Sequence, residues 1–558
     1  MANPLKSAAA MNAGRRAQWR ALGLTEEDLL KPKIAVVNSS SELAVCYAHL
    51  NGVAKVVKDA VRAAGGIPFE IPTCAPSDFI VSAASGGGYI LASRDLVTND
   101  IECQVGAAML DGMVCLSSCD KTPPGHLMAA GRLDIPTILV IGGYQKSGEL
   151  NGERVDVEDV FLAQVHARIG RPGNRDLNAM ADNAIRGPGV CAGMATANSM
   201  AIVCEALGMT LPGNSPVAAN SETMFDYARR AGERIVRMVE EDLTPRKIMT
   251  RESFVNASAA VLAVCGSINC VKHLQAIAVE AGVDVDVFGL FREHTGKIPV
   301  LSAIRPNGTY LIEDFDHAGG ARAVLKQLLP LIEPSAMTCT GKTLAENLAD
   351  YKVANEEVIR PLDRAYTDKA PIVILRGSLA PDSAIAKMGL RTDGDRPETF
   401  DGTAIVYETG PGAIEGLAKG EVKPGHVLIA RNQGVKGGPG MAGGAASIVF
   451  AVDGAGLGGQ IAFITDGQLS GLCNKGLTIA EVSPEAATGG PIALVRDGDR
   501  ITVDIDAGTI ELLVAEEELA RRRAEPQRPL NPATGWLSMY RDDVQPMSRG
   551  AVLSPNRR

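Results

Sequence analysis

Short apolar runs alternate with helix-patterned segments over about the first 350 residues of the chain. Three of these runs predict buried strands: KIAVVNSS (33–40), DGMVCLSS (111–118) and IPTILVIGG (135–143). Apolar residues with helical spacing follow the first two runs, over residues 49–66 and 125–133. Because strands that alternate with helices are typical of a parallel sheet, we predict an α/β domain over residues 1–355.

The pattern changes twice further along the chain. Residues 195–285 are dominated by helical spacing, whereas from about residue 370 short apolar runs are separated by Gly, Pro and Asp. These runs predict strands in PIVILRGSLAPD (371–382), TAIVYET (403–409), GHVLIARNQG (425–434), QIAFITDG (460–467) and GPIALVRDGDRITVDIDAGTIELLV (490–514). We therefore predict a second, β-rich domain over residues 370–558, built as a barrel or a sandwich, with residues 338–363 as the connection.

Length and charge limit the class of protein. At 558 residues the chain is longer than the ~250–300 residues at which single cores stop growing, so two or more domains are expected. The net charge of −10 argues against nucleic acid or an anionic membrane as a partner, since both select basic surfaces. No apolar run reaches the ~18 residues of a membrane span, and the first residues lack the apolar segment of a signal peptide. We expect a cytoplasmic enzyme that acts on a small molecule.

The cysteines indicate a metal centre rather than disulfides. None of the eleven forms a C-x-x-C pair, so a metal site would have to be assembled from distant loops. Cys46, Cys119 and Cys191 each lie at the end of an apolar run or beside a Gly-rich turn, where they could face one crevice. Three thiolates are one short of a full cluster complement, which would leave an iron open to a substrate oxygen. The opposing interpretation, small buried hydrophobic residues, stays open for these three and is the simpler one for Cys74, Cys103, Cys115, Cys204, Cys265, Cys270 and Cys339.

The stretch LSSCDKTPPGHL (117–128) carries three kinds of chemistry on successive residues. Cys119 is a soft sulfur ligand, Asp120 a hard oxygen ligand and Lys121 a nitrogen nucleophile. The preceding strand and the following helix place this triplet at a strand-to-helix turn. Open α/β sheets bind ligands in the crevice beyond the carboxyl ends of their strands, so the triplet has the position expected of a site.

Several long motifs together resemble the dihydroxy-acid dehydratase and sugar-acid (phosphogluconate) dehydratase family, nearly from end to end. They are VVNSSSELAVCYAHLNGV, SSCDKTPPGHLMAAGRLDIPT, GPGVCAGMATANSMAIVCEALGMTLPGN, VKGGPGM, ITDGQLSG and VSPEAATGGPIALVRDGD. The resemblance implies a hydro-lyase that converts a 2,3-dihydroxy acid to a 2-keto acid without a redox step.

The same resemblance implies roles for individual residues. Cys46, Cys119 and Cys191 would hold an iron–sulfur cluster, [2Fe-2S] in members with three cysteines, with [4Fe-4S] as the alternative. Asp78, Asp120 and a carbamate on Lys121 would bind Mg²⁺, because the carbamate turns the amine into an oxygen ligand for a hard cation. Ser470 would be the base that removes the C2 proton.

The chain departs from the family pattern at the magnesium site. Gly443 stands where the family usually has a glutamate ligand, and Gln433 where a carboxylate is common. The C-terminal domain therefore contributes less negative charge, although waters can complete a magnesium shell.

Three functions remain open from the sequence. The chain could be a dihydroxy-acid dehydratase, a dehydratase for a sugar acid (an aldonate), or a catalytically impaired paralogue that still binds the cluster. Retention of the three cysteines, Lys121 and Ser470 argues against the third. The resemblance also implies a homodimer or a homotetramer. We further expect Cys473 to lie outside the site and His49 to be satisfied by the backbone.

Overall fold

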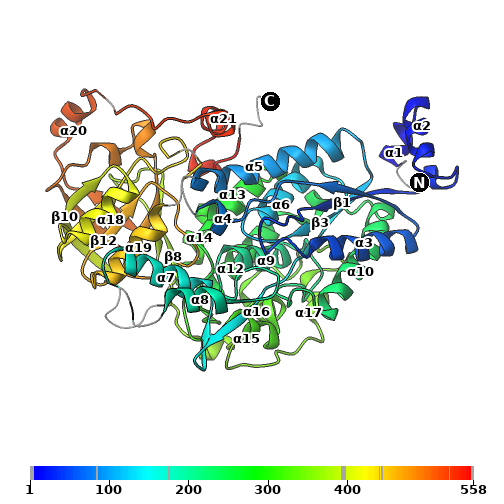
Figure 1. Cartoon of the computed structure of the whole chain (residues 1–558), viewed down its shortest axis with the longest axis horizontal. Coiled ribbons are helices and arrows are strands. Elements are labelled where there is room, and N and C mark those ends of the chain that lie inside the picture. The colour runs from blue at the N-terminus through cyan, green and yellow to red at the C-terminus, as the bar shows by residue number, and fades with distance from the viewer. Residues whose placement is uncertain are drawn as a thin grey trace.

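The structure is a computed structural model, and it describes residues 5–82, 86–171, 173, 176–390, 397–438, 440–441, 444–526 and 528–553. Figure 1 shows a parallel sheet near the N-terminus and a larger, strongly curved sheet in the C-terminal half, with the helices of the middle of the chain between and below them. We call the chain before β8 (Ile372–Leu375) the N-terminal part and the chain from β8 on the C-terminal part. The mixed α/β fold predicted from the sequence is confirmed.

The N-terminal sheet has four parallel strands in the order β2-β1-β3-β4. They are β1 (Lys33–Asn38), β2 (Ile67–Pro72), β3 (Gly112–Ser117) and β4 (Thr137–Ile141). All residues of β1, β3 and β4 are buried, which explains their continuous apolar runs, because helices cover both faces of a parallel sheet. Helices α3 and α10 pack on one face, and α6 packs against β3 on the other.

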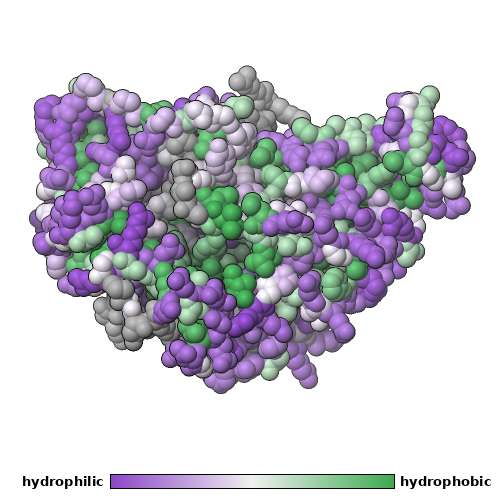
Figure 2. All heavy atoms as spheres, in the orientation of Figure 1, coloured by the Kyte–Doolittle hydropathy of each residue, from purple (hydrophilic) through white to green (hydrophobic). Residues whose placement is uncertain are grey.

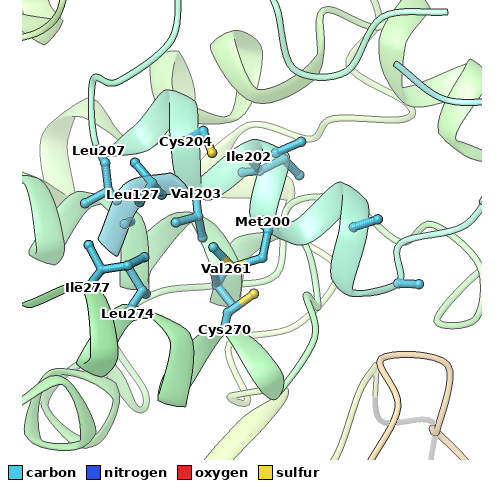
Figure 3. Close-up of a cluster of buried hydrophobic side chains, with 14 of the residues drawn as sticks. Leu127, Met200, Ile202, Val203, Cys204, Leu207, Val261, Cys270, Leu274 and Ile277 are labelled. Atoms are coloured by element: carbon cyan, nitrogen blue, oxygen red, sulfur yellow. The ribbon is translucent and has the colours of Figure 1, made fainter. Parts of the chain in front are cut away.

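A group of helices forms the core beside this sheet. Figure 3 shows side chains of α6, α9, α12 and α13 packed together, among them Leu127, Val203, Val261 and Leu274. Gly131 of α6 allows the closest approach, since a Cβ atom there would lie 2.8 Å from Ala281 of α13. The helices of the N-terminal part are α1 (Lys6–Ala9), α2 (Ala13–Ala21), α3 (Leu50–Ala63), α4 (Asp78–Val81), α5 (Tyr89–Ile101), α6 (Thr122–Leu133), α7 (Val157–Arg168), α8 (Leu177–Asn183), α9 (Thr196–Ala206), α10 (Glu222–Glu240), α11 (Pro245–Ile248), α12 (Arg251–Ala263), α13 (Asn269–Ala281), α14 (Val287–His294), α15 (Ile312–His317), α16 (Gly320–Leu328) and α17 (Leu344–Leu348).

Smaller elements complete the N-terminal part. A three-stranded sheet joins β5 (Lys146–Leu150), β6 (Glu153–Val155) and β7 (Ile185–Arg186) in the order β6-β5-β7. The short helical turns of the whole chain are η1 (Asp28–Leu30), η2 (Gly86–Gly88), the π-helical η3 (Glu102–Gly106), η4 (Leu329–Leu331), η5 (Leu362–Arg364), η6 (Ala486–Thr488), η7 (Pro491–Leu494) and η8 (Met547–Arg549).

The C-terminal sheet has eight strands in the order β15-β14-β10-β11-β12-β13-β9-β8. The strands after β8 are β9 (Ser383–Lys387), β10 (Thr399–Tyr407), β11 (His426–Ala430), β12 (Ala462–Thr465), β13 (Leu477–Ser483), β14 (Arg500–Asp504) and β15 (Thr509–Leu512). A bridge between Arg376, directly after β8, and Thr509 of β15 brings the two edges together, so the sheet is nearly closed into a barrel. Side chains alternate along the strands: Val427 and Ile429 point into the barrel core, whereas Leu428 and Ala430 join the core shared with the helices.

The structure differs from the expected elements in places. The C-terminal part also contains α18 (Gly410–Ala418), α19 (Gly444–Gly454), α20 (Glu516–Arg523) and α21 (Gly535–Asp543), so it is less purely β than the pattern indicated. The first described residues form two short helices, α1 and α2. A Gly-rich composition hid α18 and α19, because glycine is a poor helix former and reads as a turn.

The two parts meet directly at the helices that border the site. Phe161 of α7 stacks edge to face on Phe450 of α19, with ring centroids 5.3 Å apart. On its other side Phe161 meets Phe79 of α4 at 6.0 Å. This row of rings crosses from the N-terminal to the C-terminal part, and two of its members, Phe79 and Phe161, line the cavity described next.

Candidate functional site

A cavity of about 400 Å³ lies where the two parts meet. Its lining includes all but one of the residues for which the sequence predicted a role: Cys46, Asp78, Cys119, Asp120, Cys191 and Ser470. The remaining one, Lys121, is buried beneath them and contacts both carboxylates. Residues from five separate stretches of the chain therefore converge at one place.

The triplet Cys119-Asp120-Lys121 forms the turn between β3 and α6, as the sequence predicted. Two bonds hold the turn: Ser118 donates its backbone N–H to Thr122 Oγ1 (2.9 Å) and its hydroxyl to the Cys46 carbonyl (2.6 Å). Cys119 has a φ of 62°, in the left-handed region that non-glycine residues rarely adopt. Strained backbone of this kind clusters at functional sites, because the surrounding structure must hold it in place.

The sulfur side of the cavity consists of Cys46, Cys119 and Cys191. The thiols of Cys46 and Cys119 are hydrogen-bonded, and this bond together with burial raises the pKa of Cys119 well above its usual value. Burial, with the nearby charge of Asp120, likewise raises the pKa of Cys191. In the described parts of the chain, no three His, Cys, Asp or Glu side chains converge closely enough to hold a single metal ion. The thiols thus share a cavity without forming a one-ion site.

The oxygen side of the cavity is an ion-paired cluster. Lys121 Nζ donates to Asp78 Oδ2 at 3.0 Å and lies 3.7 Å from Asp120 Oδ2. Burial and the neighbouring Asp78 raise the pKa of Asp120 to about 7, although Lys121 opposes the shift. Burial disfavours the charge of Lys121, but the two carboxylates outweigh it and raise its pKa. An excess of carboxylate over ammonium makes this corner attractive to a cation.

Ser470 comes from the loop between β12 and β13 and reaches the cavity from the C-terminal part. Its Oγ accepts the backbone N–H of Leu472 at 3.2 Å. The next residue, Gly471, rests on the start of α9: a Cβ atom there would lie 2.8 Å from the backbone nitrogen of Thr196. Any larger residue at position 471 would push the Ser470 loop away from the N-terminal part.

The rest of the wall is mainly apolar. Phe79, Phe161 and Leu472 line the cavity, and so do Leu43, Val45, Ile80 and Ile185, which are large hydrophobic residues left exposed. Figure 2 shows hydrophobic side chains gathered around a hollow near the middle of the face that it draws. An exposed apolar surface that borders a cavity is typical of a binding site.

Other predictions from the sequence have mixed outcomes. Cys473 is buried and is not among the lining residues, as expected, and His49 Nε2 meets the Gly142 carbonyl at 2.6 Å. The prediction of burial is wrong for Cys103, which is exposed because η3 turns it toward solvent, and only partly right for Cys74, which is half-buried.

Gln433 is not a lining residue, and its amide donates to the Arg431 carbonyl. Gly443, the position of the missing glutamate, lies outside the described residues.

Sequence reasoning missed several polar residues at the site. Asn269 and Gln468 line the cavity, and Thr196 is hydrogen-bonded to Asp120. Behind Asn269 lies a fully buried ion pair between Lys272 and Glu481. Both charges stand inside apolar runs, CVKHL and TIAEVS, and a charge in a buried run is a signal that a partner must exist.

Thiols, carboxylates and a serine that face one cavity between an α/β part and a barrel are typical of an enzyme that acts on a small molecule. Comparison with known proteins narrows this class. Residues 31–347 match the N-terminal family of dihydroxy-acid/6-phosphogluconate dehydratases, and residues 357–551 match the C-terminal family. The chain belongs to the dihydroxy-acid/6-phosphogluconate dehydratase family, and is therefore an enzyme of the hydro-lyase class.

Individual relatives agree over nearly the whole length. The chain is 42% identical over 546 residues to a dihydroxy-acid dehydratase of Ignicoccus hospitalis, covering 97% of this chain and 98% of the relative. It is 42% identical over 543 residues to one of Pyrococcus abyssi, with the same coverage, and 40% identical over 545 residues to one of Methanosarcina barkeri.

Other expectations from the sequence are tested less fully. Among the described residues, no helix is both long and apolar enough to cross a membrane. The cytoplasmic location, the homodimer or homotetramer, and the domain limits 1–355 and 370–558 stay predictions.

Proposed function

We propose that this enzyme dehydrates an aliphatic 2,3-dihydroxy acid to a 2-keto acid, with an iron–sulfur cluster and Mg²⁺ as cofactors. The observation that carries the proposal is the single cavity that gathers three thiols, two carboxylates and Ser470. The names of the relatives support the reaction. The apolar wall favours an aliphatic substrate over a sugar acid, because a polyhydroxylated chain would lose hydrogen bonds to water against Phe79, Phe161 and Leu472.

The sulfur side fits a cluster better than a single ion. Cys46, Cys119 and Cys191 would hold it, and they are the cysteines among the lining residues. In the described part of the chain no three such side chains lie close enough to hold one ion, whereas a cluster would bind the three thiolates through more than one iron atom. If bound by these three thiolates, a [2Fe-2S] or [4Fe-4S] cluster would supply an iron with an open coordination position, and so Lewis acidity toward the 3-hydroxyl. Because the thiols of Cys119 and Cys191 have raised pKa values, binding releases protons.

The oxygen side fits magnesium. Asp78, Asp120 and a carbamate on Lys121 would present only oxygen atoms, the ligands that Mg²⁺ prefers. Magnesium supplies positive charge that acidifies the C2 proton of a bound 2-hydroxy acid. Nearby carboxylates favour the ammonium form of Lys121, which cannot react with carbon dioxide, so carbamate formation requires a cation that neutralises those carboxylates.

Ser470 is the proposed base. Its oxygen removes the C2 proton, the electron pair forms the C2–C3 double bond, and the 3-hydroxyl departs with a proton as water. The resulting enol becomes the 2-keto acid by proton transfer to C3. The N–H of Leu472, directed at Ser470 Oγ, stabilises negative charge on that oxygen before the proton is taken.

The substrate test uses enzyme purified without oxygen and a keto-acid assay. We expect turnover of 2,3-dihydroxy-3-methylbutanoate and little turnover of gluconate. Faster turnover of gluconate would support the sugar-acid alternative instead. No turnover of either compound, with iron and magnesium bound, would identify a catalytically impaired paralogue.

Variants test the individual roles. Ser470→Ala should lower turnover by about 10²–10⁴-fold, the usual contribution of an acid–base group, and keep the visible absorption of the cluster. Ser378→Ala is the matched control and should keep activity, because Ser378 follows β8, donates its hydroxyl to Glu511 of β15 and does not line the cavity. Cys46→Ser, Cys119→Ser and Cys191→Ser should each bleach the protein, whereas Cys270→Ser, in the helical core, should not. Full colour in any of the first three would refute its role as a ligand.

A further inference from the structure

The buried ion pair between Lys272 and Glu481 joins the two parts of the molecule. Lys272 lies on α13 of the N-terminal part and Glu481 on β13 of the barrel, and both side chains have no exposed surface. A buried pair of this kind gains little stability over two packed hydrophobic residues, since removing the charges from water costs about as much as the pair returns. Its presence beside the cavity calls for a role other than holding the parts together.

Lys272 sets the direction of a chain of hydrogen bonds that ends at Asp120. An ammonium group can only donate, so its bond to Asn269 fixes the amide with Oδ1 toward Lys272. Asn269 Nδ2 must then donate to Thr196 Oγ1, at 3.0 Å. Because Thr196 Oγ1 accepts the bond from Asn269, its own hydroxyl proton is free to be donated to the carboxylate of Asp120, to which Thr196 is hydrogen-bonded.

Surrounding contacts agree with this direction. Ser267 Oγ lies 2.8 Å from Thr196 Oγ1 and accepts the backbone N–H of Asn269 at 3.2 Å. Its own proton can therefore be donated to Thr196, whose single proton remains for Asp120. These contacts allow the Thr196 proton to be donated toward the carboxylate.

Glu481 holds the other side of the cavity. Its backbone N–H donates to the carbonyl of Gly467 at 3.1 Å, three residues before Ser470 in the same loop. Its φ of 55° is in the left-handed region, which turns the backbone out of the regular strand where the pairing of β13 with β9 shifts. One residue therefore anchors the Ser470 loop through its backbone and Lys272 through its side chain.

We propose that Lys272 and Glu481 are positioning residues, which act through Asn269 and Thr196 to hold the Asp120 carboxylate and the Ser470 loop in the geometry that the dehydration needs. This inference rests on the proposed function and deepens it. Neither residue lines the cavity, so neither touches the substrate.

The first test interrupts the path at Thr196 and leaves the ion pair intact. Thr196→Val removes the donor to Asp120, and we expect kcat for 2,3-dihydroxy-3-methylbutanoate to fall by about 10–100-fold, the usual cost of losing a partner of a metal ligand. Magnesium affinity, measured by calorimetric titration with MgCl₂, should weaken by a similar factor. Thr196→Ser keeps the hydroxyl and should retain both properties. Equal kcat and magnesium affinity in Thr196→Val and the wild type would overturn the inference.

The second test exchanges the pair, with Lys272→Glu and Glu481→Lys in one protein. The opposite charges remain paired, but a carboxylate at position 272 accepts rather than donates, so the Asn269 amide must turn over. Its Oδ1 would then face Thr196 and draw the hydroxyl proton away from Asp120. We expect a folded, coloured protein whose kcat stays at least about tenfold below that of the wild type, by the same loss of a ligand's partner. Recovery of wild-type kcat in the exchanged protein would show a purely structural role.

A matched control variant and the wild type distinguish failure of this inference from failure of the proposed function. Glu280 lies on the same helix α13 and pairs with Arg132 of α6 away from the cavity, so Glu280→Gln should keep kcat and magnesium affinity. If the exchanged protein does not fold, Thr196→Val and Thr196→Ser still decide the inference. An active wild type with an unaffected Thr196→Val overturns the inference alone, whereas a wild type that neither turns over the dihydroxy acid nor binds magnesium overturns the proposed function with it.

Discussion

Lys121 and Lys272 are both fully buried close to the cavity, and their surroundings shift their pKa values in opposite directions. Lys121 is near two carboxylates, Asp78 and Asp120, which raise its pKa despite burial. Lys272 has one carboxylate partner, Glu481, while the charges of Lys121 and Arg94 repel it, and burial lowers its pKa to about 8. Burial is equal at the two positions, so the difference comes from the balance of neighbouring charges.

This difference indicates different purposes for the two regions. The region of Lys121 has more negative than positive charge and opens to the cavity, so it can accept a divalent cation and lose its own proton to do so. The region of Lys272 is balanced and closed, so it has nothing to bind and can only hold its neighbours in place. Removal of the first lysine should therefore affect mainly catalysis, whereas removal of the second should lower stability in addition to the turnover that depends on its positioning role.

The largest effect is expected for Lys121→Met. Loss of the carbamate ligand would weaken magnesium binding and forfeit several kcal/mol of transition-state stabilisation, so turnover should fall by about 10³-fold or more. Initial rates of keto-acid formation at saturating MgCl₂ provide the measurement. Turnover close to that of the wild type would remove Lys121 from the site chemistry and break the comparison.

Carbamate formation itself should distinguish the two lysines. With ¹³C-labelled bicarbonate and MgCl₂, we expect a carbamate carbon signal in the NMR spectrum of the wild type and of Lys272→Met, but none in Lys121→Met. Without magnesium the signal should weaken in all three, since Asp78 and Asp120 then favour the ammonium form. A signal that persists in Lys121→Met would assign the carbamate to another amine.

The order of the two lysine variants should reverse for stability, with the larger loss in Lys272→Met. Lys272→Met leaves Glu481 buried without its partner and should lower the free energy of unfolding by about 3–5 kcal/mol. Lys121→Met should cost less, because the side chains of Asp78 and Asp120 are 22% and 19% exposed and water can replace the ammonium. Calorimetric melting at one scan rate compares the two variants. The double variant Lys272→Met, Glu481→Leu should recover most of the loss, whereas a larger loss in Lys121→Met would contradict the assignment.

The smallest effect is a dependence of stability on pH. Because the pKa of Lys272 is about 8 in the folded protein and higher in the unfolded chain, the unfolded chain binds more protons between about pH 8 and 10. The penalty for burying this charge is therefore fully present below pH 8 and is relieved as the pH rises, by at most about 1.4 kcal/mol per pH unit. Relative to the double variant, the wild type should gain stability between pH 7.5 and 9.5 in paired melting experiments. If the wild type instead loses stability relative to the double variant over this interval, the attraction of Glu481 outweighs the cost of burying the charge of Lys272.

Local patterns in the sequence were sufficient for much of the fold. The continuous apolar runs of β1, β3 and β4 predicted buried parallel strands, and the Cys119 triplet was placed correctly at the turn between β3 and α6. Both depend on residues close together in the chain, where periodicity and turn chemistry act directly. The helix α19 escaped this reasoning because its start, GAAS, is read as a loop, and its packing against α18 and α7 supports the helical form.

The sequence by itself determined the family and the strands of both sheets in outline, and it supplied the candidate metal-binding residues, whose role stays a prediction. The tertiary structure alone decided that Lys272 meets Glu481, 209 residues away, and that the path from this pair leads through Thr196 to Asp120. It also decided that Gly471 must be small, since the backbone of Thr196 lies against it. Periodicity reports which face of an element is buried, but not what faces it, because that depends on the route of the whole chain between two distant segments.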